Sequence, residues 1–170
     1  MKRYQDLVNM IESSKGFASI FAGSDSDKEH IQKISSALDY FSIPHMVHIC
    51  SAHKQCEELM ATINSYNSIE RPIFLIGVAG GTDALSGILS YHAYAPVISC
   101  PPDSPNASCL GNPKGSSNAC IWKPYNVARF IAQSFSHINP EIKQILIEEK
   151  QQKIQKLQKA NNNWFDERIS

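Results

Sequence analysis

The sequence predicts an α/β protein, a three-layer α/β/α sandwich with a central parallel sheet and a C-terminal helix extension. Three observations support this fold class. Short apolar runs alternate along the chain with longer segments in which apolar residues recur every three or four positions. Each of the first three runs ends in a short polar or glycine-rich turn. Repeated strand–turn–helix segments of this kind favour right-handed crossovers and a parallel sheet covered by helices on both faces.

The predicted strands follow from apolar runs of strand length. Residues 17–22 form an almost unbroken apolar run, as expected for a strand that is buried on both faces. Further strands are predicted at 46–50, 73–79 and 97–100, and a short one near 119–121.

The predicted helices follow from apolar residues spaced three and four apart, which share one helix face. These stripes are Ile31, Ile34, Leu38 and Phe41; Cys56, Leu59, Met60 and Ile63; Leu85, Ile88 and Leu89; and Val127, Phe130, Ile131 and Phe135. Ser26 and Glu29 have the spacing of a capping box at the start of the first stripe. Another helix is predicted near 2–14. A charged helix over 139–160 exceeds what a single sheet needs, so we expect it to cover a neighbouring subunit.

Length and composition predict one domain over residues 1–170. The chain has 170 residues and 42% hydrophobic residues, which suits a core over about 16–137 with residues 139–170 left for subunit packing. Basic and acidic residues both number 16, so no net charge draws the chain to nucleic acid or an anionic membrane. The apolar runs fall far short of the ~20 residues that span a bilayer. The first residues lack the apolar stretch of a secretory signal.

The cysteines predict reduced thiols in a cytoplasmic protein. They are Cys50, Cys56, Cys100, Cys109 and Cys120, an odd number without a Cys-x-x-Cys pair. Their spacing supplies no compact set of metal ligands. We expect most of them to act as small buried apolar groups.

Three turns hold the candidate functional residues. The first turn (residues 23–27) reads Gly-Ser-Asp-Ser-Asp, the second turn (residues 51–54) Ser-Ala-His-Lys, and the third turn (residues 79–83) Ala-Gly-Gly-Thr-Asp. In open α/β sheets, small ligands bind outside the carboxyl ends of the strands. A helix start also offers free backbone N–H groups to a phosphate. With neither a Walker pattern nor G-x-G-x-x-G, the turns predict a site for a small phosphorylated molecule.

Each turn also has a structural interpretation. Helix capping explains one or two of the serines and aspartates in the first turn, but not the whole run. A histidine beside a lysine is ordinarily a solvated pair, yet a neighbouring ammonium favours the neutral imidazole that can accept a proton. The glycines of the third turn serve either tight packing or the approach of a ligand. The histidines outside the turns are interpreted as structural or solvated: His30, His45, His48, His92 and His137.

Together these segments resemble the aminoimidazole ribonucleotide carboxylase family of purine biosynthesis. The likeness covers roughly residues 16–137 and rests on the first and second turns, Ala79-Gly80, and residues 96–102 and 110–115. The resemblance implies a flavodoxin-like fold and a homo-octamer without metal or organic cofactor. It also implies 5-aminoimidazole ribonucleotide and carbon dioxide as substrates, with no nucleic acid or membrane partner.

The family contains direct carboxylases and mutases that act on a carboxyamino precursor. Lys54 and residues 97–102 resemble the direct carboxylases, because mutases usually carry arginine at the first of these positions. Residues 81–83 match neither branch fully. The loop at 103–117 is shorter than usual, and Lys114 takes the place of the usual charged arginine.

The resemblance assigns roles to individual residues. His53 and Lys54 are the catalytic candidates, and His53 removes the proton from the carboxylated ring carbon. The substrate-binding candidates are Gly23, Ser24, Asp25, Asp27, Ser51, Ala52, Gly80, Gly81 and Lys114. Three alternatives stay open: a mutase, a flavodoxin-like flavin or response-regulator module, and an altered family member that serves only in assembly.

Overall fold

The fold is built on a central parallel sheet. The computed structural model describes residues 9, 11, 13–103 and 106–169. Its five strands are hydrogen-bonded in the order β2-β1-β3-β4-β5, with every neighbouring pair parallel. They are β1 (Phe17–Ala22), β2 (His45–Ile49), β3 (Ile73–Val78), β4 (Val97–Ser99) and β5 (Asn118–Cys120).

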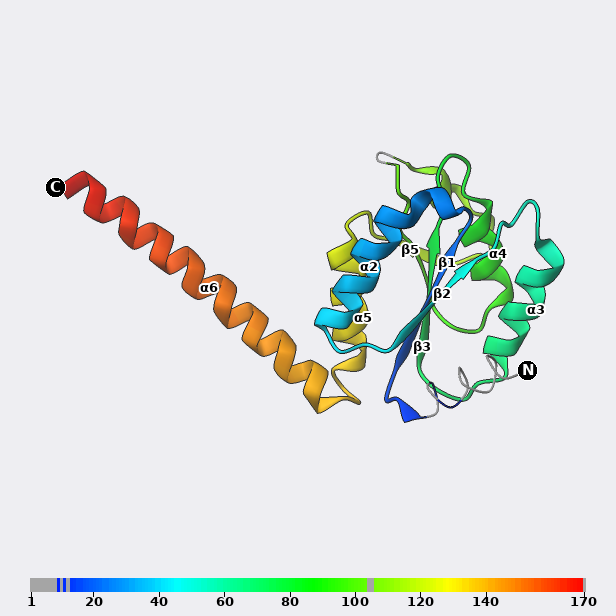
Figure 1. Cartoon of the computed structure of the whole chain (residues 1–170), viewed down its shortest axis with the longest axis horizontal. Coiled ribbons are helices and arrows are strands. Elements are labelled where there is room, and N and C mark those ends of the chain that lie inside the picture. The colour runs from blue at the N-terminus through cyan, green and yellow to red at the C-terminus, as the bar shows by residue number, and fades with distance from the viewer. Residues whose placement is uncertain (1–8, 10, 12, 104–105, 170) are drawn as a thin grey trace.

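Helices cover both faces of the sheet (Figure 1). On one face lie α2 (Lys28–Tyr40) and α5 (Pro124–Phe135), and on the other lie α3 (Cys56–Asn67) and α4 (Ala84–His92). Single 3₁₀ turns, η1 (Asp25–Asp27) and η2 (Ser108–Gly111), precede α2 and β5. The long helix α6 (Pro140–Ile169) leaves this sandwich beside α5. The predicted α/β/α class is confirmed.

Alternating side chains of β1 separate the two halves of the core. Ala18, Ile20 and Ala22 face α2 and α5, whereas Phe17 and Phe21 face α3 and α4. All five side chains are fully buried, because β1 is a central strand with helices on both sides. This double burial explains why residues 17–22 are apolar at nearly every position.

Some local predictions need correction. The capping box is wrong: Ser24 caps η1 by accepting a 3.2 Å hydrogen bond from Ser26 N, and Asp27 occupies the cap position of α2. The last helix runs to Ile169, nine residues past the predicted end at 160, because the polar residues 161–163 do not end it. The helix predicted near 2–14 falls largely outside the described residues.

Two further predictions concern the thiols and the membrane. Cys50, Cys100 and Cys109 are buried, Cys120 is half-buried, and Cys56 is exposed. All five cysteines are free. Within the described part of the chain, no helix combines the length and apolar character needed to cross a bilayer.

Candidate active site at the carboxyl edge of the sheet

The sheet brings the three turns together. In the parallel registers, Ala22 at the end of β1 lies opposite both Ile49 of β2 and Val78 of β3. Backbone hydrogen bonds continue past these strand ends, from Cys50 N to Ala22 O (2.8 Å) and from Gly23 N to Val78 O (3.0 Å). The three turns therefore start side by side at one edge, with the first turn in the middle.

The first turn is a capped 3₁₀ turn. The side chain of Ser24 accepts from Ser26 N, and the Ser26 hydroxyl donates to Ser24 Oγ at 2.8 Å. Asp25 is exposed and Asp27 is half-buried at the start of α2. The turn thus places two carboxylates and two hydroxyls at a helix start, where backbone N–H groups also face outward.

The second turn is held by its own backbone and by Gln55. Lys54 N and Gln55 N donate to Ser51 O at 3.3 and 2.9 Å, and Ser51 N donates back to the Gln55 side-chain oxygen at 3.2 Å. Ala52 is buried beneath the turn, whereas His53 and Lys54 are exposed. A closed turn on a buried alanine therefore presents the imidazole and the ammonium outward from the sheet edge.

The third turn ends in a buried cap. Asp83 is 4% exposed and accepts from Ser86 N (2.8 Å) and the Ser86 hydroxyl (2.6 Å). Burial raises the pKa of this carboxyl group, against the effect of the Ser86 hydrogen bonds. Gly81 has a φ of +65°, a left-handed conformation that glycine adopts without strain. The third turn itself therefore requires a glycine at position 81.

A loop that follows β4 closes over the third turn. Gly81 N donates to Asp103 Oδ2 at 2.8 Å. Gly81 O accepts from Asn106 Nδ2 at 2.9 Å and from the Ser108 hydroxyl at 3.1 Å. Asn106 also donates to Asp103 Oδ1 at 2.8 Å, and Asp83 N donates to Ser108 Oγ at 3.0 Å. We call Asp103, Asn106 and Ser108 the clasp. Because the clasp occupies both backbone groups of Gly81, that residue has no free main-chain partner for a ligand.

Comparison of the sequence with models of known protein families identifies the family of this chain. The model described as AIRC, AIR carboxylase, matches residues 18–156. The chain belongs to the AIR carboxylase family.

Individual relatives extend the family match. The chain is 36% identical over 129 residues to a phosphoribosylaminoimidazole carboxylase of Treponema denticola, covering 72% of this chain and 81% of the relative. It is 29% identical to a carboxylase of the same name from Archaeoglobus fulgidus, covering 91% and 89%. A bifunctional mouse carboxylase and succinocarboxamide synthetase is 35% identical, over 68% of this chain and 29% of that protein. This chain therefore spans less than a third of the mouse protein.

Solved structures of the family share the fold. Treponema denticola PurE superposes with a TM-score of 0.81 at 31% identity, covering 87% of this chain and 98% of that one. A variant of PurE2 from the same organism gives a TM-score of 0.81 at 30% identity. The flavodoxin-like fold expected for an AIR carboxylase is confirmed, and the match argues against a flavin or response-regulator module.

In this family member, His30 reaches the same edge although the sequence suggested only a structural or solvated role. Its Nε2 lies 3.1 Å from Cys100 O and 3.3 Å from Cys100 Sγ, just past the end of β4. Burial lowers the pKa of His30, against the effect of the Cys100 hydrogen bond. His30 thus links the start of α2 to the end of β4.

Lys114 is not brought to the three turns within one chain. A Cβ placed on the neighbouring Gly115 would lie 3.6 Å from the ring of Tyr91, in the last turn of α4. Because α4 begins beside the third turn and runs antiparallel to the strands, its last turn lies at the opposite edge of the sheet. A single copy of the described chain therefore does not place Lys114 beside the other substrate-binding candidates.

Proposed function

We propose that this enzyme is a phosphoribosylaminoimidazole carboxylase of purine biosynthesis. It interconverts 5-aminoimidazole ribonucleotide plus carbon dioxide with 4-carboxy-5-aminoimidazole ribonucleotide. The observation that carries the proposal is the gathering of the three turns at one sheet edge in an AIR carboxylase family member. The relatives named above are carboxylases, which favours this reaction over the mutase.

His53 is the proton acceptor in this proposal. The electron-rich ring carbon beside the amine-bearing carbon attacks carbon dioxide and forms a carbon–carbon bond. That carbon then carries both the carboxylate and a proton, and loss of the proton to His53 restores the aromatic ring. In the reverse direction His53 returns the proton and carbon dioxide leaves. The exposed position of His53 beside the first turn supports this role.

The first and second turns bind the ribonucleotide. Ser24, Asp25 and Asp27 hold the phosphoribosyl group, together with Gly23, whose small size lets the backbone approach. Lys54 and Ser51 line the carboxylate or phosphate side, supported from below by the buried Ala52. Charge-assisted contacts from a lysine to such groups are among the strongest hydrogen bonds in proteins.

The third turn positions the ring. Gly80 offers an exposed backbone surface, and a Cβ there would lie 3.5 Å from the Asp103 carboxylate. Gly81 contributes through its shape, because the clasp already uses its backbone groups. The clasp therefore fixes the wall against which the imidazole ring lies, which favours an oriented reaction.

The remaining parts of the proposal concern the assembly and its location. The enzyme works as a cytoplasmic homo-octamer without metal or organic cofactor. Exposed apolar side chains on α6 support association of copies. Lys114, at the far edge of its own sheet, serves the site of a neighbouring copy in such an assembly.

An ultraviolet assay tests the reaction. Purified protein should decarboxylate the carboxylated ribonucleotide without ATP or added metal, and should carboxylate aminoimidazole ribonucleotide when bicarbonate supplies carbon dioxide. Turnover of the carboxyamino ribonucleotide alone would identify a mutase. Lack of turnover with all of these substrates would identify a family member that serves only in assembly.

A further inference from the structure

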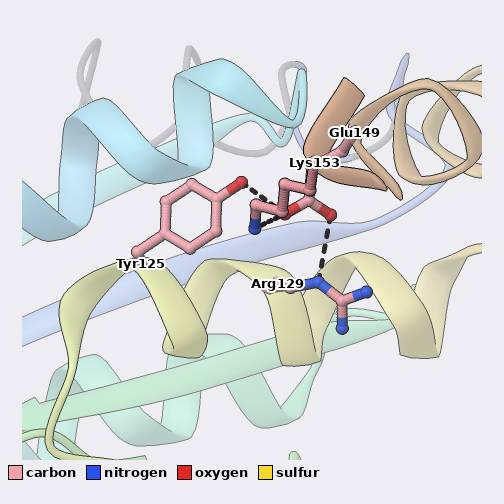
Figure 2. A network of polar contacts seen from close by, with 4 residues as sticks. All are labelled: Tyr125, Arg129, Glu149 and Lys153. Carbon is pink, nitrogen blue, oxygen red and sulfur yellow. Dashed lines mark hydrogen bonds and ion pairs between the residues drawn. The ribbon is translucent and has the colours of Figure 1, made fainter. Parts of the chain in front are cut away.

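Helix α6 is anchored to the body by apolar contacts near its start and by one buried carboxylate. Glu149 is 3% exposed and accepts from Tyr125 Oη at 2.7 Å and from Arg129 Nε at 3.0 Å, both on α5. Lys153, one turn further along α6, also bonds Glu149 (Figure 2). Burial alone would raise the pKa of Glu149, but these hydrogen bonds outweigh it and hold the pKa below its usual range. This cluster thus ties α6 to α5.

The face of α6 that packs on the body continues bare beyond it. Ile142, Leu146, Glu149 and Lys153 follow one another at four- and three-residue intervals and face α5. The same spacing continues through Leu157, Asn161 and Trp164. In Figure 1 this part of α6 stands clear of the sandwich. Leu157 is 71% exposed and Trp164 is 69% exposed, whereas Ile142 is 1% exposed.

We call residues 154–169 the distal arm, and most of it lies beyond the residues that the family model matches. The family model ends at residue 156. Treponema denticola PurE is covered over 98% of its length by only 87% of this chain. The distal arm has an apolar stripe that a monomer does not cover, and from Leu157 onward this stripe lies beyond the match to the family model.

We propose that the distal arm pairs with the distal arm of a second copy of this chain. Ile154, Leu157, Asn161 and Trp164 occupy alternating a and d positions of a heptad pattern, which is the seam of a two-helix coiled coil. Such a seam needs a helical partner with the same spacing, and the arm of another copy has it. A contact between identical surfaces closes with two-fold symmetry.

Asn161 supports a helical partner over a lipid surface. An asparagine at one a position of a coiled coil selects register and the number of helices at some cost in stability. The same amide in an apolar membrane layer would lose its hydrogen bonds to water without gaining a partner. Its place at the centre of the stripe therefore favours pairing between arms.

The area available is sufficient for a specific contact. Trp164 and Phe165 are each more than 65% exposed, and aromatic side chains bury about 150–250 Å² each. With Leu157 and Ile154, two paired arms would bury on the order of 1,000 Å² in total, at the lower limit for specific interfaces. Trp164 is the expected energetic centre, because tryptophan is enriched among residues that dominate binding.

Tryptophan fluorescence tests the pairing directly. The chain has two tryptophans, so Trp122→Phe leaves Trp164 as the sole reporter. In the full chain we expect a blue-shifted emission that acrylamide quenches poorly. Leu157→Asp should shift the emission to the red, increase quenching and lower the mass measured by light scattering. Gln155→Asp adds the same charge at an exposed b position, away from the seam, and should change none of these.

Two outcomes would overturn the proposal. One is a Trp164 emission typical of free solvent in the parent chain at micromolar concentration. The other is a protected Trp164 that Leu157→Asp leaves unchanged. Since Leu157 is exposed in a single copy, loss of folding is not expected, and far-ultraviolet circular dichroism verifies this.

A mixing experiment separates pairing of arms from docking on the body. The reporter chain is refolded with an excess of copies that carry Trp122→Phe, Leu157→Asp and Trp164→Asp. If arms pair with each other, most reporter arms meet an altered arm that lacks the apolar seam. The reporter Trp164 then becomes exposed in the mixed assemblies, which supports the proposal. Protection that persists would show that the arm binds the body of another copy instead. A blue shift that requires anionic phospholipid vesicles would identify a membrane contact and would also reject the proposal.

Discussion

Gly81 and Asp103 lie 22 residues apart in the chain, and Gly81 N donates a 2.8 Å hydrogen bond to Asp103 Oδ2. Hydrogen bonds from Asn106 and the Gly81 backbone lower the pKa of the Asp103 carboxyl group, so it is ionised at neutral pH. The loop after β4 thereby fixes the turn after β3. The turn that is expected to face the substrate ring depends on a loop side chain for its shape.

Asp103→Ala should weaken catalysis more than stability. The change removes the acceptor of Gly81 N and one partner of Asn106, so the third turn gains freedom. Hydrogen bonds to a charged group contribute about 1.5–3 kcal/mol, so we expect kcat/KM to fall by about tenfold or more. Steady-state kinetics and thermal unfolding of the same preparation measure the two effects.

Ser117→Ala is the matched control for the clasp. Ser117 is exposed in the same connection between β4 and β5 but lies outside the clasp. Its kcat/KM should equal that of the parent. Equal kinetics for Asp103→Ala and the parent would show that the third turn keeps its shape without the clasp.

His53→Asn should lower kcat and leave substrate binding largely intact. A positioned acid or base contributes about 10²–10⁴-fold to the rate, and asparagine cannot accept the ring proton. Single-turnover assays and equilibrium binding separate the two quantities. His92→Asn, at the exposed end of α4, should behave like the parent. A His53→Asn enzyme with nearly full turnover would assign the proton to another group.

Lys54→Ala should raise KM by tens of fold. Loss of one charge-assisted contact to a phosphate or carboxylate costs about 1.5–3 kcal/mol. Lys54→Arg keeps the charge and should lie much closer to the parent. Lys143→Ala removes an exposed lysine of α6 and should leave KM unchanged. A KM for Lys54→Ala equal to that of this control would place Lys54 outside the binding site.

The sheet and the gathering of the three turns were predictable because both depend on local patterns. A strand buried on two faces leaves an apolar run such as residues 17–22, and its observed bounds match the prediction without a shift. Both bounds of β2 and of β5 lie one residue before the predicted ones, and β3 and β4 end one residue earlier than predicted. Strand ends are set by hydrogen bonds to neighbouring strands, which an apolar run alone does not reveal. Parallel strands then bring the residues that follow them to the same edge.

The clasp and His30 were not predictable because their partners are distant in sequence. The clasp bonds span 22 to 27 residues and begin in a loop that has no periodic pattern. His30 meets a carbonyl 70 residues away, in a contact that depends on how α2 crosses the sheet. Serine, asparagine and aspartate in the loop after β4 signalled polar turns but not which backbone groups they would bind.

A buried hydrogen-bond chain makes stability depend on pH. Ser19 Oγ donates to Tyr66 Oη at 2.8 Å, and Tyr66 Oη lies 2.8 Å from His48 Nε2. Since the tyrosine oxygen accepts from serine, its own proton is directed at His48, which must be neutral to accept it. Burial lowers the pKa of His48 from 6.5 and raises that of Tyr66 to about 12.

We therefore expect the folded state to lose stability as the pH falls below about 6.5. A histidine whose pKa is lower when folded binds its proton more readily when unfolded, so its contribution is complete above the unfolded pKa. His48→Gln keeps an acceptor for Tyr66 but does not titrate. Between about pH 7 and about pH 5, a range in which histidine ordinarily titrates, the melting temperature of this variant should therefore fall less than that of the parent. His30 retains part of the slope, because burial lowers its pKa as well. The exposed His137→Gln variant should follow the parent at every pH, and a His48→Gln curve parallel to it would show that His48 carries no linkage.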